Sequence, residues 1–190
     1  LIVVKLLIVD NYDSFTYNLY HYVNQFISEV DVLKNDKVKI SQIKNYDKII
    51  LSPGPGLPRE HKNLFKIIDA AINKSLLGVC LGHQAIAEYF GADLLNLDMV
   101  NHGVSQEISL IEYDYIYNSL PDRFNVGLYH SWFIDRKNFP KDLIVTSENS
   151  KGNICSFKHA CLDIKGVQFH PESILTDYGL KIIENWIKFN

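Results

Sequence analysis

The chain has 190 residues, 47% of them hydrophobic and 22% charged, and its 22 acidic and 19 basic residues give a net charge of −3. This composition is ordinary for a globular protein and predicts one domain over residues 1–190. It includes no basic stripe and no apolar run of the ~20 residues that a membrane helix needs, so we expect neither nucleic acid nor a membrane as a partner. Three cysteines without a disulfide framework or a C-x-x-C pair fit a reducing, cytoplasmic environment.

The first half of the chain alternates apolar runs with segments of helical spacing. The expected strands are Val3–Val9, Val30–Leu33, Lys48–Leu51 and Leu76–Val79, and the expected helices are Ser14–Ile27, Asn63–Ile72 and the segment that begins near Gln84. Either Asp13 or Ser14 could cap the first helix. The alternation predicts the α/β class, with a mostly parallel, flavodoxin-like central sheet flanked by helices. Because ligands of such sheets bind at the carboxyl ends of the strands, we expect Asp10, Ser52 and Cys80 to share one edge.

The second half changes to short apolar segments between turns. The expected strands are His102–Leu110, Val126–Tyr129, Leu143–Thr146, Ile154–Lys158 and Cys161–Phe169. They predict a mixed or antiparallel extension of the same sheet. A final segment, Asp177–Phe189, has the spacing of an amphipathic helix.

Cys80 stands between two glycines in Gly78-Val79-Cys80-Leu81-Gly82, after a short apolar strand and before a helical segment. This pattern is typical of a nucleophile elbow, a strained turn whose close strand–helix approach needs small flanking residues. We expect the turn to push the thiol into solvent and the first helical amides to stabilise a thiolate and a developing oxyanion. The alternative is a buried core cysteine, the usual fate of a free Cys, which the glycine frame disfavours.

A thiolate nucleophile needs a base and a group that orients it. His170 follows an apolar strand, and Glu172 follows two residues later, with Pro171 stiffening the link. We interpret His170 as the general base and Glu172 as its orienting carboxylate, against the alternative of a solvated surface turn. His130 is a weaker candidate base, because no carboxylate follows it before Asp135.

Two prolines and two glycines make Ser52-Pro53-Gly54-Pro55-Gly56 a rigid loop with exposed amides. Such a loop could supply a second oxyanion donor beside the Leu81 amide, although a plain tight connection would also fit. The remaining histidines (His21, His61, His83, His102 and His159) show no metal-ligand spacing, so no metal site is expected. We interpret His83 as a packing residue and Cys155 and Cys161 as small strand residues.

Three motifs together resemble the class I (triad) glutamine amidotransferases: Pro53-Gly54-Pro55-Gly56, Gly78-Val79-Cys80-Leu81-Gly82-His83-Gln84 and Val167-Gln168-Phe169-His170-Pro171-Glu172. They occur in the order of that family and span most of the chain. Within the family, the chain particularly resembles the small glutaminase subunit (component II) of anthranilate synthase and aminodeoxychorismate synthase. That likeness rests on the runs Asp10–Leu19, Tyr129–Ser131 and Pro171–Thr176.

The resemblance implies the class I glutaminase fold and a Cys80–His170–Glu172 triad that hydrolyses L-glutamine through a glutamyl thioester. It implies that the Gly56 and Leu81 amides form the oxyanion hole. The positions that match the glutamine-binding residues of the family are Gly54, Pro55, Gly56, Leu81, Gln84, Ser131 and Trp132.

The resemblance also implies where the ammonia goes. A chorismate-binding synthase subunit would receive it for anthranilate and hence tryptophan synthesis. The alternatives are the aminodeoxychorismate branch towards folate, or a subunit that serves both. No cofactor is implied in this subunit, and Mg²⁺ is expected only in the partner synthase.

Three other interpretations stay open at this stage. The chain could be a triad amidotransferase with a different acceptor, which the opening Asn11-Tyr12-Asp13-Ser14-Phe15-Thr16 run disfavours. It could be a flavodoxin-like binding domain, but the loop after the first strand is too acidic to cradle a phosphate. It could also be a catalytically silent scaffold, which the intact triad argues against.

Overall fold

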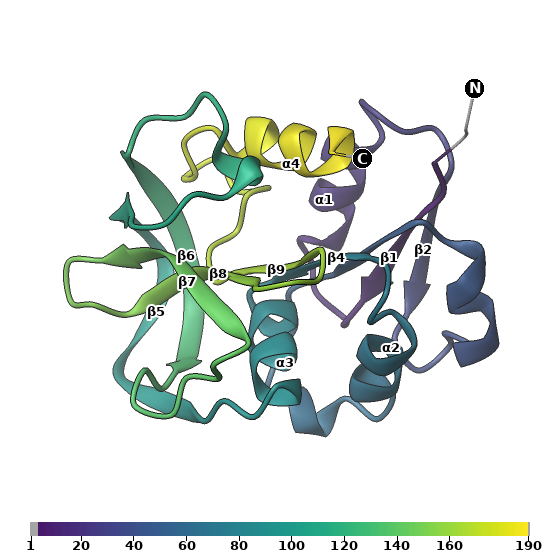
Figure 1. Cartoon of the computed structure of the whole chain (residues 1–190), viewed down its shortest axis with the longest axis horizontal. Coiled ribbons are helices and arrows are strands. Elements are labelled where there is room, and N and C mark those ends of the chain that lie inside the picture. Colours follow the sequence, from purple (N-terminus) through teal and green to yellow (C-terminus); the bar gives the residue numbers. More distant parts are fainter. Residues whose placement is uncertain (1–3, 190) are drawn as a thin grey trace.

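The computed structural model describes residues 4–189, whose strands form one nine-stranded sheet in the order β2-β1-β3-β4-β9-β8-β7-β5-β6 (Figure 1). The parallel part contains β1 (Leu6–Asp10), β2 (Val30–Lys34), β3 (Lys48–Leu51), β4 (Ser75–Val79) and β9 (Ile164–Val167). The antiparallel part contains β5 (Leu94–Leu110), β6 (Arg123–Ile134), β7 (Leu143–Asn149) and β8 (Ile154–His159). This mixed sheet confirms the predicted α/β class and its antiparallel extension.

Four helices cover the parallel part of the sheet, two on each face (Figure 1). They are α1 (Thr16–Val23), α2 (Leu64–Ala70), α3 (Leu81–Tyr89) and α4 (Gly179–Lys188), and three short 3-10 helices add η1 (Ile40–Asn45), η2 (Pro58–Glu60) and η3 (Tyr115–Tyr117). In β1, every residue is buried, because helices cover both faces of the strand. Its alternate residues enter two cores: Ile8 packs in the core that includes α1 and α4, and Leu7 in the core that includes α2 and α3.

The register of the parallel strands brings their carboxyl ends to one edge. Val9 of β1 pairs with Leu51 of β3, Leu51 pairs with Gly78 of β4, and Val79 pairs with Val167 of β9. Asp10, Ser52 and Cys80 therefore lie at the same edge, as predicted, and the segment after β9 lies beside the segment after β4.

Several element boundaries differ from the predictions. Val3, the predicted start of the first strand, lies outside the described residues. Helix α1 begins later and ends earlier than Ser14–Ile27, and its N-cap is Phe15 without a side-chain cap. Asp13 instead accepts a hydrogen bond from the Phe15 N–H at 2.8 Å, which closes a turn before the helix.

The β-rich half also departs from its predicted bounds. The long strands β5 and β6 pair with each other along most of their length, interrupted by register shifts, and so run well beyond the predicted segments. Cys161 is wrongly predicted to lie in a strand. It lies exposed in the turn before β9, where His159 Nδ1 accepts the Cys161 N–H at 3.0 Å.

Of the helices within residues 4–189, none combines the length and apolar character that crossing a membrane requires.

Candidate active site

Cys80 occupies the sharp turn between β4 and α3. Its backbone has φ 51° and ψ −102°, a conformation that is strained for any residue with a side chain. Glycines on both sides permit the close approach of strand and helix. A Cβ at Gly78 would come within 2.4 Å of the Gly82 carbonyl oxygen, and one at Gly82 within 2.3 Å of the Leu51 carbonyl oxygen. The observed geometry is thus that of the predicted elbow.

The prediction that the elbow exposes its thiol to solvent is wrong. Cys80 is only 5% exposed, and its backbone N–H donates to the Val167 carbonyl at 2.9 Å, which ties the turn to β9. Gln168, which follows Val167 in the sequence, donates from its carboxamide Nε2 to the Cys80 sulfur at 3.6 Å. The side chain of Gln168, at the end of the neighbouring strand, therefore lies against the sulfur, and two cavities reach Cys80.

His170 and Glu172 form a buried pair beside the elbow. His170 Nδ1 lies 2.8 Å from Glu172 Oε1, and the two residues are 2% and 4% exposed. A carboxylate can only accept, so Nδ1 carries the proton and Nε2 remains for the Cys80 sulfur. The backbone of His170 is fixed as well, because its N–H donates to the Gly127 carbonyl at 3.0 Å and its carbonyl accepts from Thr176 Oγ1 at 2.6 Å.

The surroundings of His170 favour its charged form. Burial by itself lowers the pKa of His170, but the Cys80 sulfur and then the Glu172 carboxylate outweigh it and raise the pKa well above its usual value. His130, by contrast, is held neutral, because burial lowers its pKa to about 4. The Nδ1 atom of His130 lies 2.8 Å from the Trp132 carbonyl. The predicted strand ends at Tyr129, just before His130, but His130 lies inside β6.

The Pro53–Gly56 loop is held by a polar network that reaches it from two other loops. Asn11 Nδ2 donates to the Ser52 carbonyl at 2.8 Å, and Asn35 Nδ2 donates to Asn11 Oδ1 at 3.1 Å. Asn35 Nδ2 also lies 2.8 Å from His61 Nδ1, and because an amide nitrogen only donates, His61 Nε2 carries the proton. His61 Nε2 then donates to the Pro55 carbonyl at 2.8 Å.

One cavity of about 140 Å³ brings together the elbow and all seven residues predicted to bind glutamine. Besides Cys80, its lining consists of Gly54, Pro55, Gly56, Leu81, Gln84, Tyr129, His130, Ser131 and Trp132. Leu81 is the first residue of α3, so its N–H is among those without an acceptor inside the helix. The geometry can accommodate a small amide substrate against Cys80, and the roles of these residues stay predictions.

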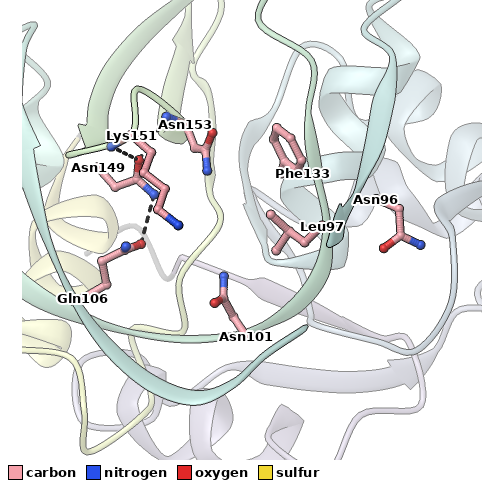
Figure 2. A pocket seen from close by; sticks show the side chains of 8 residues that line it. All are labelled: Asn96, Leu97, Asn101, Gln106, Phe133, Asn149, Lys151 and Asn153. Carbon is pink, nitrogen blue, oxygen red and sulfur yellow. Dashed lines mark hydrogen bonds between the residues drawn. The ribbon is translucent and has the colours of Figure 1, made fainter. Parts of the chain in front are cut away.

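A second cavity of about 140 Å³ also reaches Cys80, and its lining includes His170, Phe15 and His102. A larger cavity of about 450 Å³ lies among β5, β6 and the β7–β8 turn (Figure 2). Its lining is Asn96, Leu97, Asn101, Gln106, Phe133, Asn149, Lys151 and Asn153, none of them a predicted site residue. Asn149 there donates to Gln106 and accepts the Lys151 N–H, as the dashed lines show.

Sequence reasoning overlooked three kinds of residue at this site. Gln168 stands inside a quoted motif, but only the strand pairing places it against the sulfur. The ring of Tyr129 packs edge-on to His170 at 4.8 Å, and its hydroxyl lies 3.0 Å from Ser173 Oγ. Asn35 and His61 come from separate loops, and no local spacing relates them.

His83 is buried and packs on Phe157 at 4.7 Å between ring centroids, as expected.

Comparisons with known proteins agree with this architecture. A family model described as glutamine amidotransferase class-I matches residues 7–189. The chain is 42% identical over 197 residues to anthranilate synthase component 2 of Methanocaldococcus jannaschii, covering 97% of this chain and 96% of that protein. It is 39% identical over 185 residues to aminodeoxychorismate synthase component 2 of Klebsiella aerogenes, covering 96% of this chain and 98% of that protein.

A solved structure of a protein from Thermoplasma acidophilum, named as part of a GMP synthase, has the same fold. Its TM-score is 0.88 at 28% identity, covering 97% of this chain and 92% of that chain. This chain therefore matches these proteins over almost its entire length, including the elbow and the three motifs.

Proposed function

Because the chain belongs to the class I glutamine amidotransferase family, we propose that it hydrolyses L-glutamine at Cys80 and delivers the ammonia to a chorismate-binding synthase that makes anthranilate. The observation that carries the chemistry is the position of Cys80 between two cavities: one is lined by all seven predicted glutamine-binding residues, and the other by His170 of the buried His170–Glu172 pair. The acceptor is proposed from the names of relatives about 40% identical over nearly the whole chain.

The proposed first step is attack of the Cys80 thiolate on the side-chain amide carbon of glutamine. The carbonyl oxygen becomes an oxyanion, which the Leu81 and Gly56 N–H groups would hold; one such donor contributes roughly 10²–10³ in kcat. His170, protonated at Nε2, gives that proton to the departing nitrogen, so that ammonia leaves and a glutamyl thioester remains.

The second step releases glutamate. His170, now neutral at Nε2, takes a proton from a water molecule, which attacks the thioester carbon and expels the Cys80 thiolate. Glu172 keeps the proton on Nδ1 throughout and stabilises the imidazolium whenever it forms. We propose no cofactor for either step, with Mg²⁺ needed only in the partner synthase.

The second cavity supports the proposed delivery of ammonia. It meets the glutamine cavity at Gly54, Cys80 and Tyr129, and of the two it alone is lined by His170, the residue that would protonate the leaving group. Ammonia formed beside His170 could therefore leave without passing the bound glutamate. Asp13 and Ser14 line this exit, which places the start of the Asp13–Thr16 segment next to the proposed path to the synthase.

The test of the chemistry is Cys80→Ser in the complex with its synthase. We expect glutamine-dependent product formation to fall by roughly 10³-fold or more, while free ammonium still supports the synthase. Cys155→Ser is the matched control, because burial raises the pKa of Cys155 to about 12 and keeps it an inert thiol. Retention of glutamine-dependent activity by Cys80→Ser would show that the nucleophile is wrongly assigned.

The acceptor needs its own experiment, because a relative in Klebsiella aerogenes is named as aminodeoxychorismate synthase component 2. Copurification from the cell extract of the source organism, followed by an assay with chorismate and glutamine, identifies the bound synthase and its aromatic product. Anthranilate is the expected product. Aminodeoxychorismate alone would replace the proposed acceptor with the second candidate, and both products would indicate that one glutaminase serves two synthases.

A further inference from the structure

Three hydrogen bonds, two of them buried and one partly buried, form a chain from the backbone of β6 to the sulfur of Cys80. Gln84 Nε2 donates to the Trp132 carbonyl at 2.8 Å and to Gln168 Oε1 at 3.1 Å. Gln168 Nε2 then donates to Cys80 Sγ at 3.6 Å. Gln84 and Gln168 are 3% and 2% exposed, and burial strengthens hydrogen bonds between such groups.

The carbonyl of Trp132 fixes the orientation of both carboxamides. A backbone carbonyl can only accept, so the NH₂ group of Gln84 must face it. That NH₂ group has a second hydrogen, which points at Gln168 and requires the carboxamide oxygen of Gln168 on that side. The NH₂ group of Gln168 is therefore turned towards the sulfur. The opposite orientation would place two NH₂ groups against each other.

A sulfur that faces an N–H donor must accept, and a thiolate accepts more strongly than a thiol does, because the bond is then assisted by charge. The backbone N–H of Gln168 donates to the Cys155 carbonyl at 2.8 Å, which holds this donor rigidly at the end of β9. Gln168 is thus the hydrogen-bond donor to the sulfur, while His170, whose pKa the neighbouring Cys80 raises, is the group that would take the thiol proton.

We propose that Gln168 is a positioning residue for the nucleophile: its carboxamide N–H holds the Cys80 sulfur as a thiolate, and Gln84 fixes the direction of that N–H. The proposal rests on the proposed function of Cys80. It also limits the role of Gln84 at the glutamine cavity. Both of its N–H groups are engaged inside the protein, so it can offer the substrate only its carboxamide oxygen.

The test is the pH dependence of Cys80 alkylation by iodoacetamide, measured by peptide mass spectrometry in a Cys161→Ser background. In Gln168→Met, the side chain keeps its length but loses the donor. We expect the midpoint of the alkylation profile to move up by roughly one to two pH units. Glutamine turnover should lose kcat about 10-fold or more, with KM changed less than about 3-fold, because the substrate does not touch Gln168.

A second variant keeps the test valid if Gln168→Met folds poorly. Gln168→Glu retains an oxygen for Gln84 and places a second acidic group against the sulfur, so the two groups compete for one proton and the midpoint should rise further. Gln106→Met, at a glutamine that lines the cavity of Figure 2 and neither of the two cavities that reach Cys80, should match the wild type.

An unchanged alkylation midpoint in a folded Gln168 variant would overturn the proposal, even if glutamine turnover fell. A raised KM with the midpoint unchanged would make Gln168 a substrate contact. Because alkylation needs neither glutamine nor the synthase, these outcomes are independent of whether Cys80→Ser abolishes turnover.

Discussion

At the scale of single residues, the site depends on one strained position and the side chains that cover it. A non-glycine residue at positive φ costs on the order of 1–3 kcal/mol, and Gly78 and Gly82 make that conformation possible at Cys80. The glycine frame is local, so the sequence predicts the elbow. The burial of the thiol is not predictable in the same way, because Gln168 reaches the sulfur from a strand end 88 residues further along the chain.

The Glu172 carboxylate is expected to act on the charge of His170 as well as on its orientation. In Glu172→Gln the negative charge is lost, so the pKa of His170 should fall from its raised value. Glutamine turnover should drop by roughly 10²-fold or more, because the imidazolium loses its stabilising partner. NMR titration of His170 measures the first effect and steady-state kinetics the second.

Glu112→Gln is the control for this prediction, since Glu112 is an exposed partner of Lys158 far from the triad in sequence. A His170 pKa in Glu172→Gln equal to that of the wild type would contradict the proposed role of the carboxylate.

At the scale of elements, the parallel strands position the site and the loops between them complete it. Alternating strands and helices predict correctly that Asp10, Ser52 and Cys80 reach one edge. The network that holds the Pro53–Gly56 loop could not be predicted, because Asn35 and His61 come from loops that meet only after the sheet has formed. The local sequence therefore predicts a rigid loop but not the contacts that aim its amides.

We expect His61→Ala to release the Pro55 carbonyl and let the loop move. An oxyanion donor displaced by about 1 Å can cost up to about 10²-fold in rate, so kcat for glutamine should fall by roughly 10-fold or more, while the fold stays intact. His21→Ala is the matched control, because His21 is exposed on α1. Steady-state glutaminase kinetics of the complex measure the effect, and wild-type kcat in His61→Ala would show that the loop is rigid without this contact.

At the scale of the whole molecule, a residue from the first half of the chain holds the end of the last helix against the sheet. Lys48, at the start of β3, donates from its buried Nζ to the Trp186 carbonyl at 3.2 Å and to the Phe189 carbonyl at 2.9 Å. These bonds satisfy carbonyls at the end of α4 that have no partner within the helix. Helical spacing predicts α4, but no pattern in the sequence indicates that a strand lysine 138 residues away holds its end.

Buried histidines should make the stability of the molecule depend on pH. Burial lowers the pKa of His83 to about 3, whereas an unfolded histidine has a value of about 6.5. Between these values the unfolded chain binds a proton that the folded chain does not, so the free energy of unfolding falls as the pH falls. His130, with a pKa of about 4, acts in the same direction over most of this range. His170, whose pKa is raised, has already bound its proton in both states at the acidic end.

Replacement of His83 by methionine isolates the contribution of His83 to the pH dependence of the free energy of unfolding. Methionine is apolar, fits an irregular space and packs well on an aromatic ring such as that of Phe157. We expect the slope of unfolding free energy against pH, measured by denaturant titration from about pH 4.5 to 6, to be smaller in His83→Met by about 1.4 kcal/mol per pH unit. His21→Met, at an exposed site, should keep the wild-type slope. Parallel slopes for His83→Met and the wild type would mean that His83 is protonated in the folded protein, and its burial would then need a charged partner.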